Sequence, residues 1–336
     1  MHIKDAISCI VDREDLSGAD MESVMRQVMT GEATPIQIGG FLAGLRTKGE
    51  TVEEITAAAR VMREMATRVT VSTDRLVDTC GTGGDGHSLF NVSTACAFVV
   101  AAAGGRVAKH GNRSMSSKSG SADVLEALGV NIEQSPEQVA ETIESIGLGF
   151  LFAPAHHGAA KHAAAPRREL GTRTLFNLLG PLTNPANAPH QLLGVFASRW
   201  VEPVAKVLRG LGSRHVLVVH SEDGLDEISP SAPTLVSELQ NGQVRSYRID
   251  PTEFGVRFQS LDSMIVAGPK ASAELIQRVF HGETGVAFDM VMLNAGAALY
   301  AADVAATLSD GIALARAALE DGLALQKLEQ LRAAAR

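Results

Sequence analysis

Apolar side chains recur every three or four positions through the first seventy residues, the spacing of one face of a helix. The clearest of them are Val24, Met25 and Val28, followed by Ile38, Phe41, Leu42 and Leu45. Thr34 precedes a proline suited to a first helical turn, and Thr51 with Glu54 forms a capping box. The second pattern predicts a helix running to about Arg68. Because so short a bundle has little core of its own, we expect its apolar faces to pack on the rest of the chain or on a second subunit.

From residue 76 onward, short β-like runs alternate with helical patterns. These segments span residues 76–78, 91–103, 106–108, 121–128, 136–146, 149–152, 192–196, 201–211 and 215–219. Such alternation is typical of a mostly parallel sheet covered by helices. Residues 234–249, with Asn241-Gly242 at their centre, predict an antiparallel hairpin, and residues 290–331 predict a helical tail. We therefore predict an α/β protein with a small N-terminal all-helical domain and a larger α/β domain.

Composition narrows the possible functions. The 336 residues carry a formal net charge of −8 with no long Lys/Arg run, which argues against nucleic acid as a partner. The longest apolar stretch, residues 95–105, is shorter than the roughly 20 residues that span a bilayer. The three cysteines contain no CxxC pair, so a disulfide framework or a structural zinc site is not expected. Without a signal-peptide pattern at its start, the chain is predicted to be cytoplasmic.

A glycine-rich loop, Gly81-Thr82-Gly83-Gly84-Asp85, follows one predicted strand and precedes a helix. Bare backbone N–H groups in such a loop can point at phosphate oxygens, and the helix N-terminus adds a favourable dipole. The alternative is a tight turn that only lets strand and helix approach each other. The loop matches neither a Walker loop nor a GxGxxG dinucleotide fingerprint.

Two further polar segments shift the balance toward anion binding. Asn91, Ser93 and Thr94 open the next predicted helix, and capping explains only one of them. Residues 109–123 follow the next strand and combine Lys109 and Arg113 with many hydroxyl groups and glycines. Because ligands bind beyond the carboxyl ends of parallel strands, we expect the loops to meet at one sheet edge.

The ordered motifs resemble the anthranilate phosphoribosyltransferase family over nearly the whole chain, more weakly after Pro230. They are GTGGD at 81–85, NVST at 91–94, KHGNR at 109–113, GSADVLEALG at 120–129, RRELG at 167–171, FNLLGPLTNP at 176–185 and DGLDEIS at 223–229. The resemblance implies a homodimer and transfer of 5-phosphoribosyl from phosphoribosyl pyrophosphate to anthranilate in tryptophan biosynthesis. It also implies that residues 1–70, joined by helices from about 159–185, form the small domain, and that 71–158 and 186–336 form the α/β domain, with the active site between them.

The resemblance carries particular residues over. The donor would contact Gly81, Thr82, Gly83, Gly84, Asp85, Asn91, Val92, Ser93, Thr94, Lys109, His110, Gly111, Asn112, Arg113, Ser114, Met115, Ser116, Ser117 and Ser121. Anthranilate would be held by Gly81, Asn112, His157, Arg167, Gly180 and Pro181. Mg²⁺ would be bound by Ser93, Asp226 and Glu227. The family's dimer would form through the N-terminal helical domain.

This chemistry suits the residue types. Adjacent carboxylates such as Asp226 and Glu227 suit Mg²⁺, although an exposed acidic pair is the commoner fate of such a dipeptide. Arg167 can grip a carboxylate with two parallel hydrogen bonds, the alternative being a helix-surface salt bridge, and we expect Arg168 to face solvent. No covalent nucleophile is expected, because the aromatic amine attacks with its own lone pair. Of the nearby histidines we expect His157 to line the acceptor pocket.

Several positions depart from the family pattern. They are Leu89 in place of a hydroxyl residue, Gly158 and Ala160 in place of Pro and Met, and Ala165-Pro166 in place of Pro-Val. They affect one donor contact and the shape of the acceptor pocket, and leave the proposed catalytic set intact. Two other functions stay open from the residues: a related pyrimidine nucleoside phosphorylase and a non-catalytic paralogue that binds nucleic acid. The glycine loop and the Asp226-Glu227 pair favour the transferase.

Overall fold

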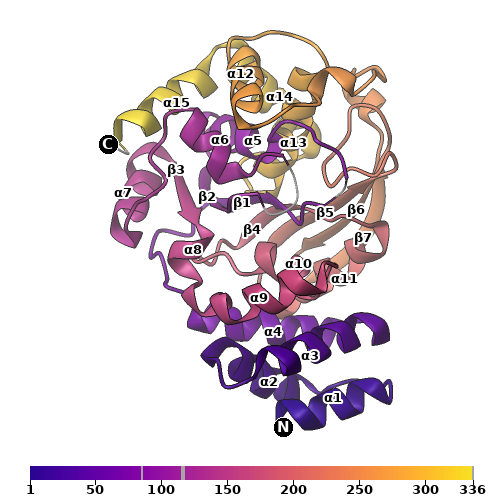
Figure 1. Ribbon diagram of the computed structural model, residues 1–336. Coiled ribbons are helices and arrows are strands. Elements are labelled where there is room, and N and C mark those ends of the chain that lie inside the picture. The colour runs from indigo at the N-terminus through magenta and orange to yellow at the C-terminus, as the bar shows by residue number, and fades with distance from the viewer. Residues whose placement is uncertain (85, 115–117, 335–336) are drawn as a thin grey trace.

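The computed structural model describes residues 1–84, 86–114 and 118–334 (Figure 1). Four helices at one end of the molecule form a bundle: α1 (Ile3–Val11), α2 (Gly18–Thr30), α3 (Pro35–Lys48) and α4 (Val52–Met65). The capping boxes at Thr34 and Thr51 are both formed. Helix α4 ends at Met65 rather than near Arg68, because the chain turns away there and the Thr67 N–H donates to the His156 carbonyl at 2.9 Å.

A seven-stranded sheet forms the centre of the larger part, in the order β3-β2-β1-β4-β5-β6-β7. The strands are β1 (Leu76–Gly81), β2 (Arg106–Gly111), β3 (Leu148–Phe152), β4 (His190–Gly194), β5 (His215–Ser221), β6 (Thr234–Gln240) and β7 (Gln243–Ile249). All pairs from β3 to β5 are parallel, whereas β6 and β7 add antiparallel partners. Asn241 and Gly242, with φ of 53° and 76°, form the two-residue turn that the sequence predicts. The predicted α/β fold class is confirmed.

Alternation along the strands divides the core between the two faces of the sheet. On β5, Leu217 and Val219 belong to one core cluster, and Val216 and Val218 belong to another. The first cluster packs under α5 (Val92–Ala102), α6 (Ser121–Ala127), α12 (Pro269–Phe280), α13 (Val286–Ala301), α14 (Leu308–Glu320) and α15 (Leu323–Ala334). The helical bundle therefore lies on the other side of the sheet from these helices, as Figure 1 shows.

The second cluster joins the bundle to the sheet. Helix α11 (Val201–Gly210) and the short α10 (Phe176–Leu179) contribute to it, together with Ala163 from α9 (Lys161–Leu170). The remaining elements are α7 (Pro136–Ile146), α8 (Ala153–His156) and the 3₁₀ turns Gly158–Ala160, Gly180–Leu182, Ser198–Trp200, Pro251–Phe254 and Asp262–Met264. Because α9 and α10 share a core with the bundle, they hold residues 161–182 against the carboxyl edge of the sheet.

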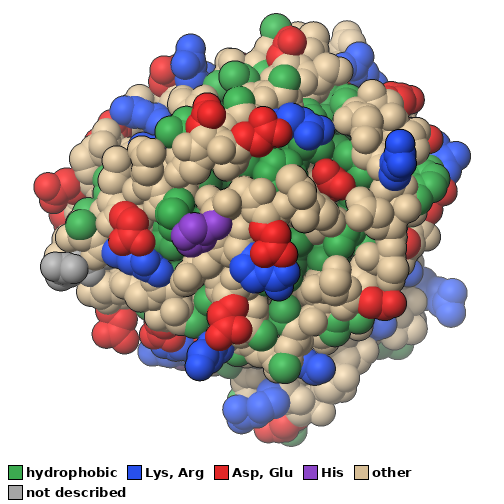
Figure 2. All heavy atoms as spheres, turned by 90° about the horizontal axis from the view of Figure 1, so that it is seen from above, with side chains coloured by type: hydrophobic (Ala, Val, Ile, Leu, Met, Phe, Trp, Pro, Cys, Tyr) green, Lys and Arg blue, Asp and Glu red, His purple; other side chains and the backbone are tan. Residues whose placement is uncertain are grey.

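The surface carries charges of both signs. In the view of Figure 2, Lys/Arg and Asp/Glu side chains are interspersed over the face formed by the upper helices of Figure 1. Within the described ranges, no helix is both long and apolar enough to cross a membrane.

Candidate active site

The glycine loop is fixed at the carboxyl ends of β1, β4 and β5. The Gly83 N–H donates to Asp226 Oδ2 at 2.8 Å, and the Thr82 N–H donates to the Gly194 carbonyl at 2.9 Å. A Cβ at Gly81 would lie 2.5 Å from Asp226 Oδ2, and one at Gly194 would lie 1.5 Å from the Asp226 carbonyl oxygen. Only glycine allows this approach. A carboxylate oxygen therefore already sits on a loop N–H, in the manner of a phosphate oxygen.

Lys109 ties the ends of two strands to the start of helix α5. Its side chain is nearly buried, with 3% of the residue exposed. The Nζ group donates to the Thr79 carbonyl at 2.6 Å and to Ser93 Oγ at 3.1 Å. Burial lowers the pKa of Lys109, and the negative charges of Asp78 and Glu227 oppose that shift. Lys109, Ser93 and the carboxylates after β5 therefore belong to one polar cluster.

Asp78 and Asn184 support this cluster from inside the protein, and neither was predicted as a site residue. Asn184 Nδ2 donates to Asp78 Oδ2 at 2.8 Å and to the Ala108 carbonyl at 2.7 Å. The His110 N–H donates to Asp78 Oδ1 at 3.2 Å. Burial raises the pKa of Asp78 to about 6, although Lys109 and Asn184 pull it down. The pair fixes the spacing of β1 and β2.

Helix α5 begins at the same edge, and its first polar residues have different surroundings. Asn91 makes no side-chain cap. Instead its Nδ2 donates to the Ser119 carbonyl at 3.2 Å, and its Oδ1 accepts from Ser119 Oγ at 2.8 Å and Ser272 Oγ at 3.0 Å. Thr94 Oγ1 is buried and has no hydrogen-bond partner among the described residues. Asn91 thus anchors the polar loop after β2, while Ser93 accepts from Lys109.

The loop after β2 returns to helix α6. Ser121 Oγ donates to the Asn112 carbonyl at 3.3 Å, and the Ser114 N–H donates to Asp123 Oδ2 at 3.0 Å. The half-exposed Arg113 guanidinium pairs with Asp123 and Glu126, at 3.2 and 2.5 Å. The structure therefore turns this cation toward α6 and away from the glycine loop. The predicted contacts at Asp85, Met115, Ser116 and Ser117 lie outside the described residues.

Two neutral histidines, one from β2 and one after α8, lie side by side. The rings of His110 and His157 are 5.1 Å apart, and both residues are buried. Neither His157 nitrogen, nor His110 Nε2, has a hydrogen-bond partner among the described residues. Burial lowers the pKa of His110 to about 3 and that of His157 to about 4. Of the other histidines, His156 Nδ1 lies 2.9 Å from the Thr67 carbonyl and has a structural contact.

Arg167 on helix α9 is a half-buried cation. Its guanidinium lies over the Phe176 ring, 5.1 Å from the centroid. Burial lowers its pKa, and within the described part of the chain no carboxylate forms an ion pair with it. This removes the alternative of a helix-surface salt bridge. Arg168 is exposed, as the sequence predicts. A desolvated, uncompensated guanidinium is suited to bind an anion.

The oxygen ligands available for a metal suit Mg²⁺. Among the residues that the structure describes, no three His, Cys, Asp or Glu side chains converge into a metal-binding group. Asp226 contacts the glycine loop. The charge of Glu227 raises the pKa of both Lys109, which contacts Ser93, and Cys96. Mg²⁺ needs few protein ligands because it retains water and takes phosphate oxygens. The hydroxyl of Ser93 and the carboxylates of Asp226 and Glu227 are therefore oxygen ligands of the kind that Mg²⁺ prefers.

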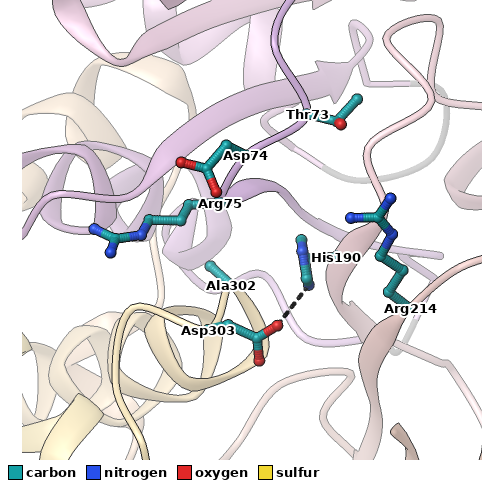
Figure 3. A pocket seen from close by; sticks show the side chains of 7 residues that line it. All are labelled: Thr73, Asp74, Arg75, His190, Arg214, Ala302 and Asp303. Carbon is teal, nitrogen blue, oxygen red and sulfur yellow. Dashed lines mark ion pairs between the residues drawn. The ribbon is translucent and has the colours of Figure 1, made fainter. Parts of the chain in front are cut away.

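A separate cavity of about 300 Å³ opens at the opposite edge of the sheet (Figure 3). It lies where β4 and β5 begin. His190 faces Asp303 there, with Nδ1 3.9 Å from a carboxylate oxygen. Arg75 and Arg214 also line it. None of the described motif residues lines this cavity, so it is not part of the candidate active site.

Comparisons with known proteins agree with this arrangement. The helical bundle domain of the glycosyl transferase family matches residues 4–66, and its a/b domain matches residues 73–325. An anthranilate phosphoribosyltransferase of Thioalkalivibrio sulfidiphilus is 62% identical over 98% of each chain. The crystal structure of the Thermus thermophilus anthranilate phosphoribosyltransferase is 46% identical, with a TM-score of 0.94 over 99% of each chain. The structure of the Saccharomyces cerevisiae anthranilate phosphoribosyltransferase in complex with phosphoribosyl pyrophosphate (PRPP) and Mg is of a chain 25% identical to this one. The TM-score is 0.90 over 99% of this chain and 97% of the yeast chain.

Proposed function

Because this chain belongs to the anthranilate phosphoribosyltransferases of the glycosyl transferase family, we infer how its own residues carry out that reaction. The enzyme is a pentosyltransferase of tryptophan biosynthesis. It transfers 5-phosphoribosyl from 5-phospho-α-D-ribose 1-diphosphate to the amine of anthranilate. The products are N-(5-phosphoribosyl)anthranilate and pyrophosphate. The nucleoside phosphorylase and non-catalytic alternatives fall away with this relationship.

For the donor, we propose that the 81–85 loop, residues 91–94, residues 109–117 and Ser121 together hold the phosphoribosyl diphosphate. The observation that carries this proposal is the Gly83 N–H, which binds an Asp226 carboxylate oxygen at 2.8 Å. An N–H that binds an anionic oxygen here is aimed correctly for a diphosphate oxygen. Lys109 stabilises the same site indirectly, because its Nζ fixes Ser93 Oγ and the end of β1. Because the Arg113 guanidinium pairs with Asp123 and Glu126, we propose that Arg113 contacts the donor through its backbone.

Ser93, Asp226 and Glu227 would hold Mg²⁺. When bound, Mg²⁺ neutralises charge that develops on the leaving diphosphate. In the protein without ligands, Asp226 Oδ2 accepts from the Gly83 N–H, and the diphosphate would take over that N–H when it binds. The buried Lys109 places a further positive charge beside Ser93. Lys109 and the backbone N–H groups of the glycine loop would therefore add to the positive potential around the leaving diphosphate.

For the acceptor, we propose a pocket formed by Gly81, Asn112, His157, Arg167, Gly180 and Pro181. The uncompensated Arg167 guanidinium would bind the anthranilate carboxylate through two parallel hydrogen bonds. Neutral imidazoles at His110 and His157 do not compete for that carboxylate as cations would. Since the amine attacks with its own lone pair, orientation by these groups supplies much of the rate. Cys80 and Cys96 are poor nucleophiles, because burial raises the pKa of both thiols.

We propose that the cleft lies between two domains. Residues 1–70 with the helices of about 159–185 form the smaller one, and residues 71–158 and 186–336 form the larger. The shared core of the bundle with α9 and α10 supports this division. Arg167 would then approach the diphosphate loops from the smaller domain.

We further propose a homodimer formed through the helical bundle. Ile36 on α3 is 89% exposed and Val11 on α1 is 70% exposed, and these two helices pack side by side. Two exposed apolar side chains on neighbouring helices suit a self-complementary contact. For location we propose the cytoplasm, which the unpaired cysteines Cys9, Cys80 and Cys96 fit.

The activity is tested by mixing the purified protein with Mg²⁺, phosphoribosyl pyrophosphate and anthranilate, and following the loss of anthranilate fluorescence. Turnover should require all three components. Uridine with phosphate serves as the control substrate pair. Phosphorolysis of uridine without consumption of anthranilate would overturn the proposed function.

A further inference from the structure

A second cavity, of about 360 Å³, lies where the helical bundle meets the sheet domain. One wall is the end of helix α3, at Arg46 and Glu50. The other contains Arg173, which lies between α9 and α10, and Arg199 and Trp200, which follow β4. None of the described residues proposed to bind donor, acceptor or metal lines it, although Arg173 connects it to the glycine loop at Gly84.

Three arginines line this cavity, and none of them has a carboxylate partner among the described residues. Arg46 Nη1 donates to the Arg173 carbonyl at 2.6 Å, and Arg173 Nη2 donates to the Gly84 carbonyl. The Arg199 guanidinium lies 5.6 Å from the centre of the Trp200 ring. Within residues 1–84, 86–114 and 118–334, none of the three forms an ion pair with a carboxylate at 4.0 Å or less.

The other charged groups of the lining do not cancel this positive charge. Lys48 is already paired with carboxylates, because its Nζ lies 2.6 Å from Asp15 Oδ1 and 3.0 Å from Glu54 Oε2. Glu50 is the carboxylate among the described lining residues; burial raises its pKa, and the charge of Arg46 opposes that shift. Among the described lining residues, with Lys48 already paired, three arginines against one carboxylate leave an excess of two positive charges.

Unsatisfied polar atoms occur in the same lining. Trp200 Nε1 and Thr174 Oγ1 are buried, and neither has a hydrogen-bond partner among the described residues. Such atoms cost free energy unless a ligand or an ordered water satisfies them. Together with planar guanidinium groups, which match phosphate and carboxylate oxygens, they are typical of a site built to take an anion.

We propose that this cavity binds a small polyanion, with two or more phosphate or carboxylate groups, between Arg46, Arg173 and Arg199. Arg173 also holds the Gly84 carbonyl, so a bound polyanion competes for that guanidinium. When the polyanion is bound, the glycine loop loses its contact with Arg173 at Gly84, and donor binding becomes weaker. This second step rests on the proposed function, whereas the binding itself does not.

Binding is measured by calorimetry on the metal-free protein, with inorganic triphosphate in one titration and citrate in another, to distinguish phosphate from carboxylate ligands. Arg46→Gln and Arg199→Gln should each weaken binding by about tenfold or more, the effect of losing one charge-assisted hydrogen bond. Arg168→Gln, an exposed change on α9, should leave it unchanged. Because Arg46 and Arg199 are exposed, these variants should fold, and Arg199→Glu checks the charge dependence. Binding that is absent, or equal in wild type and both Gln variants, would refute the proposal.

Kinetics separate this cavity from the active site. In wild type, the anion that binds should raise KM for phosphoribosyl pyrophosphate, and Arg199→Gln should lose this effect while keeping its activity without the anion. Inhibition that persists undiminished in Arg199→Gln would place the anion on the donor loops and overturn the inference. If neither substrate is turned over, the calorimetric result still decides whether the site exists.

Discussion

Replacing Arg167 by glutamine should separate acceptor binding from both donor binding and stability. The guanidinium is half-buried, and burial alone lowers its pKa, with no carboxylate of the described residues opposing the shift. We propose that the anthranilate carboxylate is its partner. Removing the cation therefore removes an interaction that exists only when the acceptor is bound.

The magnitudes can be worked from these contacts. A hydrogen bond to a charged group contributes about 1.5–3 kcal/mol, so the acceptor KM should rise by about 10- to 100-fold. In the protein without substrate, the same change removes a desolvated charge and also the contact over the Phe176 ring, worth about 0.5–1 kcal/mol. These two effects have opposite signs. The free energy of unfolding should therefore change by less than about 1 kcal/mol.

The assay combines steady-state kinetics for each substrate with urea unfolding. KM for anthranilate should rise while KM for phosphoribosyl pyrophosphate changes little, and Arg168→Gln is the matched control on the exposed side of α9. Arg167→Lys should recover only part of the loss, because an ammonium group cannot make two parallel hydrogen bonds. Equal losses for both substrates, or destabilisation above about 2 kcal/mol, would show that Arg167 is structural.

Three further outcomes are expected. Asp226→Asn should raise the Mg²⁺ concentration needed for half-maximal rate, while the exposed Asp262→Asn should not; an unchanged magnesium titration would remove Asp226 from the metal site. The folded protein keeps His157 neutral down to about pH 4, whereas the unfolded imidazole protonates near pH 6.5, so the free energy of unfolding should fall as pH drops through that window. Urea unfolding of His157→Gln should show a shallower slope there, and an identical slope would contradict the assignment. Ile36→Glu should shift sedimentation toward monomer and Leu314→Glu, on α14, should not; a wild-type profile for both would argue against the bundle interface.

Local patterns predicted the parts of the fold that local physics determines. The two capping boxes and the Asn241-Gly242 turn depend on residues within four positions of each other, and all three are present. The family resemblance also predicted that the glycine loop and Asp226 would belong to one site. Their proximity is confirmed by the contact between the Gly83 N–H and Asp226.

Other features depend on contacts between distant residues. Asp78 and Asn184 are 106 positions apart, and the residues around each of them do not predict that the two side chains form a buried hydrogen bond. Arg113 was predicted to contact the donor, and the sequence pattern did not show that its guanidinium pairs with Glu126 on the following helix. The predicted tail began at residue 290, whereas α13 begins at Val286. Helix α13 is buried on nearly all sides and lacks the polar face that marks an amphipathic helix. Helix α12 was not predicted.

The most direct measurement is a crystal structure of the enzyme with Mn²⁺ in place of Mg²⁺ and with phosphoribosyl pyrophosphate, in which anomalous scattering locates the metal. The account predicts a metal beside Ser93, Asp226 and Glu227, with diphosphate oxygens accepting from the Gly83 N–H. A diphosphate bound at the opposite edge of the sheet, beside Arg75 and Arg214, or a metal remote from all three proposed ligands, would contradict it.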